Sequence, residues 1–165
     1  MRWPVNMKGA DQRSHAIWII DYFDDFRGPN EWAFLSNFYA APIAMEAGIC
    51  YPTTEHYFQS WKPIDQDERV NILRAPGPVA AKALGNSCQL RPDWDRVKVD
   101  VMLMAVRAKF TQHPVLGSKL IKTGDALLVE GNTWGDRIWG AVDGDGENLL
   151  GLILMLVRAE LRLRR

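Results

Sequence analysis

The strongest constraint on the fold is a long helix that the sequence predicts from Asp93 to about His113. Its apolar residues recur at i, i+4, i+7 and i+11, which is the spacing of one stripe along a helix. The residues on this stripe are Val97, Val101, Met104 and Ala108. No other segment of the chain carries so clear a periodic signal, so the fold is expected to contain this helix.

Shorter helices are predicted on both sides of it. Residues 65–75 form a surface helix that Pro76 stops, and residues 77–87 form a second one that ends near Gly85. Residues 114–124 form another helix, which Gly124 is placed to cap. The closing helix, residues 149–165, is apolar nearly all round at its start, which predicts a central place in the core.

Strands are predicted to be few and short. Residues 16–23 are β-branched and aromatic and indicate a buried strand, and residues 126–130 indicate another. The apolar pieces between 31 and 52 are broken by Pro42 and Gly48, which favours a hairpin or two short strands. The predicted fold class is therefore mainly α, a single compact domain with a few short β-strands.

Composition narrows the class of protein further. The chain has 165 residues, with 20 Lys+Arg against 20 Asp+Glu and a formal net charge of +0. A protein that coats a nucleic acid duplex usually has a basic excess, whereas a local cationic pocket is compatible with neutrality. Two cysteines far apart, no signal-peptide pattern and no apolar run of membrane-spanning length predict a soluble cytoplasmic protein. The three histidines have no metal-ligand spacing, so no metal site is predicted.

The segment "YPTTEHYFQSWK" (51–62) predicts a short helix with Thr53 as its N-cap. Glu55, Gln59 and Lys62 fall on one side of this helix, and aromatic residues fall on the other. An ordinary surface helix explains this pattern, because an early carboxylate and a late amine complement the helix dipole. An active site also explains it, since burial makes a carboxylate a proton donor and an amine a nucleophile.

A second candidate is the glycine-rich stretch "GDRIWGAVDGDGENLLG" (135–151). Its glycines allow the backbone to approach a ligand, and it leads into a helix N-terminus. It fits neither a dinucleotide fingerprint nor a calcium loop nor a phosphate-binding Walker pattern. A plain connecting loop is the alternative, although tryptophans in a polar loop are costly to expose unless they pack or stack on something.

These segments together resemble one family, the NADAR or YbiA-like domains. The resemblance spans about residues 21–160, with residues 1–20 as an N-terminal extension and first strand and 161–165 as a C-terminal tail. The motifs that carry it, in the family's order, are "LSNFY", "YPTTEHYFQSWK", "AKALGN", "LRPDWDRVKVDVMLMAVRAKF", "LLVEGNTWGDRIWG" and "GENLLGLILMLVR". Several separated motifs in one order make chance similarity improbable.

The resemblance implies a mainly α-helical fold and an enzyme that cleaves N-glycosidic bonds. Family members are associated with the bond between ribose, as ribose 5-phosphate or ADP-ribose, and a base or amino group. Some resemble hydrolases of phosphoribosylated riboflavin-pathway intermediates, and others are linked to removing ADP-ribose from guanine in nucleic acid. The implied partners are a small ribosylated or ADP-ribosylated molecule and, as a further possibility, ADP-ribosylated nucleic acid, with no membrane and no cofactor.

Residue by residue, the family's acidic and lysine positions match Glu55 and Lys62 here. Its Asp-x-x-Trp-Gly signature matches Asp136, Trp139 and Gly140, and its Asn-x-x-Gly matches Asn148 and Gly151. The stretch "GAVDGDGEN" departs from the family pattern by an inserted or shifted acidic run. The predicted substrate-binding residues are Asn37, Arg27, Gln59, Trp94, Trp139, Gly140 and Asn148.

Two catalytic routes fit these residues. In one, the ribose opens and Lys62 captures C1 as a Schiff base while Glu55 shuttles protons. In the other, Glu55 and Asp136 are a carboxylate pair that stabilises an oxocarbenium-like sugar. We favour the first, because the second leaves Lys62 with only a binding role. The candidate donors for a substrate phosphate are Arg27, Lys82, Arg91 and the backbone N–H groups of the last helix. The alternative to an enzyme is a non-catalytic ADP-ribose or NAD-binding module.

Overall fold

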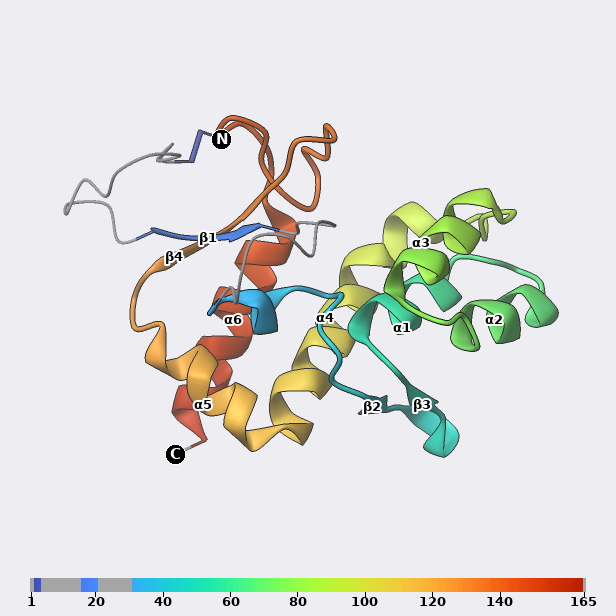
Figure 1. Cartoon of the computed structure of the whole chain (residues 1–165), viewed down its shortest axis with the longest axis horizontal. Helices are drawn as coiled ribbons and strands as arrows, with labels where there is room; N and C mark the ends of the chain where they lie inside the picture. The colour runs from blue at the N-terminus through green and yellow to red at the C-terminus, as the bar shows by residue number, and fades with distance from the viewer. Residues whose placement is uncertain (1, 4–15, 21–30, 165) are drawn as a thin grey trace. The chain divides into compact units, whose positions relative to one another are not determined.

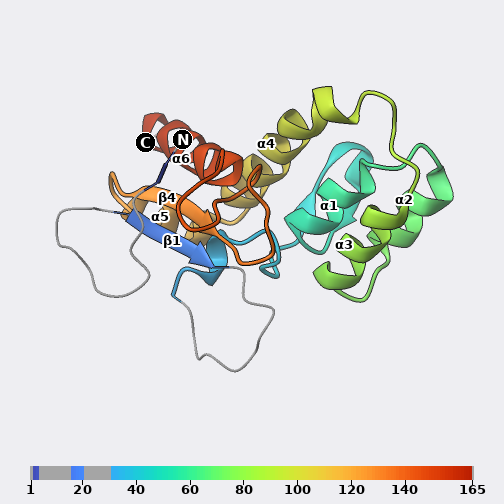
Figure 2. The ribbon, with the colours of Figure 1, turned by 90° about the horizontal axis from the view of Figure 1, so that it is seen from above.

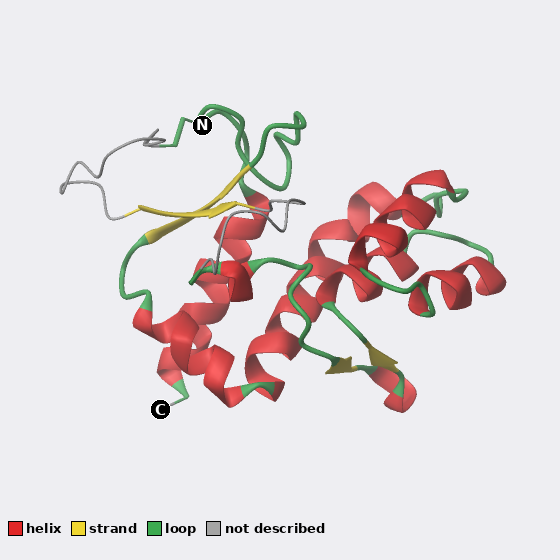
Figure 3. Cartoon of the chain, viewed as in Figure 1, coloured by secondary structure: helices red, strands yellow, loops and turns green. Residues whose placement is uncertain are grey.

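The computed structural model describes residues 2–3, 16–20 and 31–164. Helices make up most of this part of the chain, with short strands between them (Figure 3), which confirms the predicted mainly α class. The described residues divide into two compact units. The helical unit is residues 37–114, and the terminal unit combines the described part of residues 1–36 with residues 115–165. No helix among the described residues is long and apolar enough to cross a bilayer.

The helical unit contains one small hairpin and four α-helices. Strands β2 (Ile43–Ala44) and β3 (Cys50–Tyr51) pair antiparallel, which confirms the predicted hairpin. The helices, labelled in Figure 1, are α1 (Thr54–Ser60), α2 (Gln66–Leu73), α3 (Pro78–Ser87) and α4 (Trp94–Gln112). Helix α1 packs against the other three, and every residue of α1 is buried. A wholly buried helix cannot be an ordinary surface helix, so that reading of residues 51–62 is wrong.

Helix α1 begins as predicted and ends earlier. The Thr53 hydroxyl accepts a hydrogen bond from the backbone N–H of His56 at 3.2 Å, which confirms the predicted N-cap. The helix ends at Ser60, and Lys62 follows it in a tighter turn in which its N–H donates to the Gln59 carbonyl. Lys62 therefore leaves the helix end, whereas the sequence placed it in the last helical turn.

Helix α4 lies where the sequence predicts it, but its buried face is different. Of the predicted stripe, Val101 is buried, while Val97, Met104 and Ala108 are only partly so. At 100° per residue the centre of the buried face is turned by roughly 100° from the predicted stripe. Neighbouring α1 and β2 contact that face and determine which side is covered. The residues buried there are Trp94, Val101, Met102, Ala105, Val106, Lys109 and Phe110.

The terminal unit is built around two parallel strands, β1 (Ala16–Ile20) and β4 (Leu127–Gly131), which run side by side in Figures 1 and 2. These strands confirm the two predicted ones as far as the structure describes them, since residues 21–23 lie outside the described part. Helix α5 (Pro114–Lys122) precedes β4, and Gly124 follows α5 with φ +62°, as expected of a glycine cap.

Helix α6 (Leu149–Leu163) packs along β4 through one face only. Leu152 and Leu156 are exposed, so the helix that was predicted to be central to the core contributes one face to it and leaves apolar residues on the other. Close approach to the strand depends on Gly151, because a Cβ there would lie 2.1 Å from the carbonyl oxygen of Leu128. The buried residues of α6 are Leu150, Gly151, Ile153, Leu154, Val157 and Arg158.

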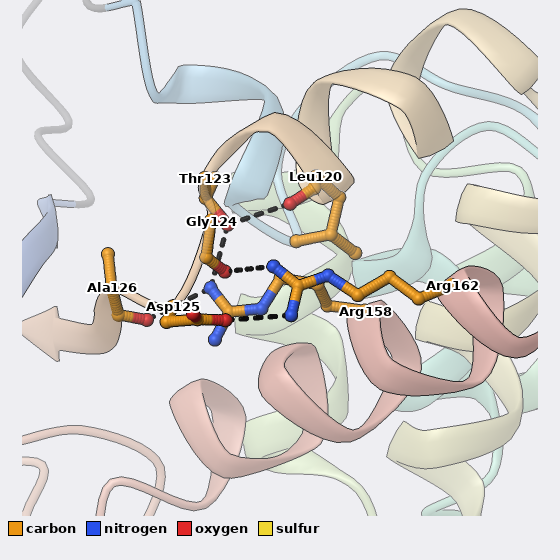
Figure 4. Close-up of polar contacts among 7 residues, drawn as sticks. All are labelled: Leu120, Thr123, Gly124, Asp125, Ala126, Arg158 and Arg162. Carbon is orange, nitrogen blue, oxygen red and sulfur yellow. Dashed lines mark hydrogen bonds and ion pairs between the residues drawn. The ribbon is translucent and has the colours of Figure 1, made fainter.

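Two arginines of α6 hold the turn between α5 and β4 (Figure 4). Arg158 is buried and donates to the Thr123 hydroxyl at 2.7 Å and to the Ala126 carbonyl at 2.9 Å. Arg162 is more exposed and pairs with Asp125 at 2.8 Å. These contacts give the basic end of α6 a structural role within the unit.

Candidate active site

The first group of predicted site residues lies in the helical unit, on the side of α1 that faces α3. Glu55 is 5% exposed and Gln59 is 2% exposed, although both are strongly polar. The Gln59 Nε2 donates to Glu55 Oε1 at 2.6 Å, so the two side chains share one face of α1, as the sequence predicts. A buried carboxylate is costly unless hydrogen-bonded, and this contact offsets part of that cost.

Lys62 lies at the same side of α1, just beyond its end. Its Nζ donates to Oδ1 of Asn86 on α3 at 3.0 Å and lies 5.8 Å from the centre of the Phe58 ring. Burial lowers the pKa of the Lys62 amine from its ordinary 10.5. The negative charge of Glu55 opposes this lowering of the pKa. A lowered pKa increases the fraction of neutral, nucleophilic amine near neutral pH.

Two more titratable groups surround this amine. The ammonium of Lys82 on α3 adds to the lowering of the Lys62 pKa, whereas Cys88 opposes it. Burial in turn raises the pKa of the Cys88 thiol, so this thiol favours its neutral form. The site therefore contains one buried acid, Glu55, and two amines, one just beyond the end of α1 and one on α3, with an exposed asparagine as the acceptor for the first.

Asn37 lies at the N-terminal end of α1. Its carbonyl oxygen accepts from the Glu55 N–H at 3.1 Å and from the Thr54 hydroxyl at 2.9 Å. Its side chain donates to the sulfur of Met102 at 3.3 Å and accepts from Thr54 at 3.2 Å. Asn37 is thus next to the catalytic candidate Glu55 through its backbone, and its contact with a substrate stays a prediction.

Trp94 is placed for packing in this structure. It is 8% exposed, and its ring lies 5.1 Å from the Phe58 ring at an interplanar angle of 58°. Two buried rings in this arrangement stabilise the contact between α1 and α4. Because the Trp94 side chain is buried, little of its ring is open to a substrate base. The stacking of Trp94 on such a base stays a prediction.

The opposite side of α1 faces a separate pocket of about 300 Å³ between the hairpin and α2. Burial raises the pKa of Tyr57, one of its lining residues, to about 12. The lining residues are Met45, Glu46, Ala47, Ile49, Tyr51, Tyr57, Ser60, Trp61, Gln66, Arg69, Val70 and Leu73. None of the predicted site residues is among them, so this pocket is not the predicted site.

The second group of predicted residues lies in the terminal unit, in the glycine-rich loop before α6. Asp136 is half-buried, and its Oδ1 accepts from the N–H groups of Ile138 at 3.0 Å and Trp139 at 2.9 Å. Asn132 exchanges two further hydrogen bonds with the backbone of Asp136. The carboxylate of Asp136 therefore organises its own loop, a role that an aspartate turn commonly has.

Asn148 has a similarly structural environment. It is fully buried, with φ +54°, and its side chain donates to the Leu128 carbonyl and accepts from the Glu130 N–H, both at 2.9 Å. Both ends of the amide are thus bonded to β4. The predicted contact of Asn148 with a substrate is not tested by these bonds, but its amide is used within the fold.

The start of α6 is closed by the same loop. The N–H groups of Asn148, Leu149 and Leu150 donate to carbonyls of Gly140, Ile138 and Trp139 at 3.0 to 3.2 Å. These groups are the ones that a bound anion would need at a helix N-terminus. The loop backbone accepts from these three groups, and the contact of the helix N-terminus with a phosphate stays a prediction.

The remaining predicted residues are less informative. Gly140 is buried, and a Cβ there would lie 2.4 Å from the Glu130 carbonyl oxygen, so its glycine serves close packing. Trp139 is half-buried. Arg91 is paired with Asp93 at 2.6 Å, which raises the pKa of Arg91 and reduces its capacity to attract a phosphate. Arg27 lies outside the described residues.

Two residues of the site were missed from the sequence. Asn86 holds the Lys62 amine, and Gly85 contacts Gln59. The available signal was spacing, since Lys82 and Asn86 are four residues apart and share one face of α3. Among the described residues, no group of three or more histidine, cysteine or carboxylate side chains is arranged to hold a metal.

Comparison with known proteins identifies the family. The NADAR domain matches residues 24–162, which is most of the chain. The chain belongs to the NADAR family. A solved structure, the NMR structure of the E. coli protein YbiA, superimposes on this chain with a TM-score of 0.76 at 38% identity, covering 93% of this chain and 92% of that one.

Curated relatives agree with this assignment. The NADAR chain is 41% identical to N-glycosidase YbiA of Escherichia coli over 150 residues, which is 89% of this chain and 91% of that protein. It is 42% identical over 118 residues to N-glycosidase Npun_R5314 of Nostoc punctiforme, covering 68% and 75% of the two chains. It is also 41% identical over 155 residues to the riboflavin biosynthesis protein VVA0006 of Vibrio vulnificus, covering 92% of this chain but 41% of that one.

Proposed function

We propose that this NADAR domain is an N-glycosidase that hydrolyses the bond between C1 of a ribose and the nitrogen of a base or amino group. The observation that carries the proposal is the pairing of a buried acid, Glu55, with an amine of lowered pKa, Lys62. Relatives that align over most of this chain are named N-glycosidases, which supports the same reaction class.

The chemistry of the pair favours a Schiff-base route. The neutral Lys62 amine attacks C1 of the ring-opened sugar, the C1–N bond to the base breaks, and Glu55 gives a proton to the departing nitrogen. Water then adds to C1, Glu55 accepts a proton from it, and the bond from C1 to Nζ breaks. The freed aldehyde closes to ribose, so one water molecule is consumed and both side chains regain their starting states.

The structural role of Asp136 supports this route over the carboxylate-pair route. In the latter, Asp136 would act together with Glu55 on the sugar cation, but one oxygen of its carboxylate already accepts two backbone N–H groups. We therefore assign proton transfer to Glu55, covalent capture to Lys62 and loop organisation to Asp136.

We further propose a ribosylated metabolite as the substrate. The net charge of +0 supports a small molecule, because a nucleic acid target favours a basic surface. A phosphoribosylated aminopyrimidine of riboflavin biosynthesis is the first candidate, given the name of the Vibrio vulnificus relative. ADP-ribosylated guanine in nucleic acid is the second. The free thiols of Cys50 and Cys88 support a reducing compartment such as the cytoplasm.

The test is a substrate panel with products identified by mass. The chain is incubated with a phosphoribosylated aminopyrimidine, with DNA carrying ADP-ribosylated guanine and with NAD. We expect release of the free base or amine from the first substrate, and loss of that activity in Lys62→Ala. Lys98→Ala, which removes an amine paired with Asp95 on the surface of α4, is the matched control and is expected to remain active.

Two outcomes would contradict the proposal. Tight binding of ADP-ribose with no cleavage of any of the three substrates would establish a binding module instead. Turnover that persists without a trapped adduct on Lys62, after treatment with borohydride during the reaction, would replace the Schiff-base route by direct hydrolysis.

A further inference from the structure

The Gln59 side chain fills a closed gap between Glu55 on its own helix and Gly85 on α3. It is 2% exposed, and its Nε2 makes a short hydrogen bond of 2.6 Å to Glu55 Oε1. Its Oε1 is shielded from solvent and has no hydrogen-bond partner among the described residues. Of the two polar atoms of the amide, only Nε2 is therefore hydrogen-bonded within the described residues, and its acceptor is the carboxylate that the proposed reaction uses.

Gly85 makes this gap possible. A Cβ at position 85 would lie 2.1 Å from Gln59 Oε1, so that the end of the Gln59 side chain would have to move, and 3.0 Å from Gln59 Cβ, which is a tight contact. Gly85 is inside α3, where glycine is less favourable than alanine, and the helix needs no unusual backbone angle there. Gly85 was predicted to lie near the end of this helix, but α3 continues to Ser87. Space for Gln59 is the physical reason for a glycine at this position.

The same geometry argues against a substrate contact for Gln59. A side chain that binds substrate directs a polar atom into an open cleft, whereas both ends of this amide are covered by protein. A buried acceptor without a partner is unfavourable, and such a group persists where the surrounding packing fixes it. The Gln59 amide is thus enclosed by protein and bonded to Glu55, an arrangement that suits a side chain that holds a neighbouring group in place.

We propose that Gln59 is a positioning residue for Glu55, and that Gly85 is required because α3 must leave room for the Gln59 amide. This inference rests on the proposed function, in which Glu55 transfers the proton. A carboxylate that gives and takes a proton within one reaction cycle needs a fixed oxygen position, because small displacements of reacting groups lower the rate. Gln59 supplies that position through one short hydrogen bond, and the absence of a Cβ at Gly85 leaves the space that the Gln59 amide occupies.

The experiment is a double-mutant cycle of Gln59→Ala and Gly85→Ala, measured for thermal unfolding and for turnover. In the wild-type background Gly85→Ala is expected to lower Tm by about 4 °C or more, because the added methyl group displaces the amide. In the Gln59→Ala background the same change is expected to leave Tm equal or higher, since the gap is empty and alanine favours helix. Gly77→Ala, at the start of α3 with open space around its Cβ position, is the control.

Turnover tests the positioning role. Each single variant is expected to lower kcat by about tenfold to a hundredfold with KM changed by less than about twofold. The double variant is expected to be no slower than Gln59→Ala alone, because both changes act on the same carboxylate. A rise in KM with kcat unchanged would overturn the proposal and make Gln59 a substrate-binding residue. Additive losses in kcat, or a Tm loss from Gly85→Ala in both backgrounds, would also overturn it.

A failure of the proposed N-glycosidase function gives a different result from a failure of the positioning role. A wild-type chain that turns over none of the three ribosylated substrates refutes the N-glycosidase and, with it, the positioning of a catalytic acid. The Tm cycle still decides in that case whether Gly85 makes room for Gln59. If the wild-type protein is active and the losses in kcat of the two single variants add in the double variant, the positioning role of Gln59 is refuted and the N-glycosidase function is not.

Discussion

The Lys62 amine donates a hydrogen bond to Oδ1 of Asn86 at 3.0 Å, which joins the end of α1 to the last turn of α3. This contact holds the amine at the same side of α1 as Glu55. Asn86 is exposed, so its amide can also bind water, whereas burial still lowers the pKa of the Lys62 amine. The pair therefore orients the amine without restoring its ordinary preference for the charged form.

Replacing Lys62 by methionine is expected to abolish turnover and to stabilise the fold. The folded-state pKa of Lys62 is lowered, so between that value and 10.5 the unfolded chain binds more protons and wild-type stability rises with pH. Below that window the charged amine is unfavourable in the folded state, and methionine removes this cost. Chemical unfolding at pH 7 and pH 10 measures the effect. The variant is expected to exceed wild type at pH 7, and the difference is expected to shrink at pH 10.

An unchanged stability difference between the two pH values would show that Lys62 titrates as it does in the unfolded chain. Lys98→Met is the control for loss of an amine, because Lys98 pairs with Asp95 on the surface of α4. Surface pairs of this kind contribute little, so this control is expected to change stability by less than about 1 kcal/mol.

The two arginines of α6 offer a second prediction in the other unit. Arg158→Met is expected to lower the free energy of unfolding by about 2–4 kcal/mol, because the buried Thr123 hydroxyl and the Ala126 carbonyl lose their donor. Arg162→Met removes an exposed pair with Asp125 and is expected to cost less than about 1 kcal/mol. Urea unfolding of both variants measures the two losses in the free energy of unfolding. Equal losses of unfolding free energy in the two variants would show that the burial of Arg158 does not determine how much it stabilises the fold.

The elements were predictable where local chemistry determines them. Thr53 caps α1 because its hydroxyl accepts a nearby N–H, and Gly124 follows α5 because glycine adopts positive φ readily. These preferences act over three or four residues and are visible in the sequence. The positions of most helices and strands follow from signals of this kind.

The site was predictable only in part, because packing between helices decides the rest. Glu55 and Gln59 share a face by helix geometry alone. Nothing in the local sequence shows that α1 ends before Lys62. Nor does it show that Gly85, on another helix, leaves room for the Gln59 side chain. Asp136 has the residue type of a catalytic acid, and its bonds to two backbone N–H groups are visible only in the structure.

A third prediction concerns His56, which is buried within α1. Its Nε2 lies 3.2 Å from the Ala75 carbonyl oxygen and its Nδ1 2.8 Å from the Thr53 hydroxyl. Burial lowers the pKa of His56 from 6.5, so its stability contribution is complete above pH 6.5 and is lost as pH falls through the lower folded-state value. His56→Gln is therefore expected to weaken the fall in stability between pH 7 and pH 5. Thr53→Ala, which removes the cap but no titrating ring, is expected to lower stability and keep that fall.

The last prediction separates the two roles of Asp136. Its Oδ1 accepts from Ile138 and Trp139, and an asparagine keeps an oxygen at that position while removing the charge. If Asp136 serves to hold the loop, Asp136→Asn is expected to retain turnover within about threefold, whereas Asp136→Ala is expected to lose about tenfold or more. Steady-state kinetics on the substrate found in the panel measures both. An asparagine variant as inactive as the alanine variant would mean that the negative charge itself is needed. That result would favour Glu55 and Asp136 as a carboxylate pair acting on the sugar cation, and Lys62 would then be a binding residue.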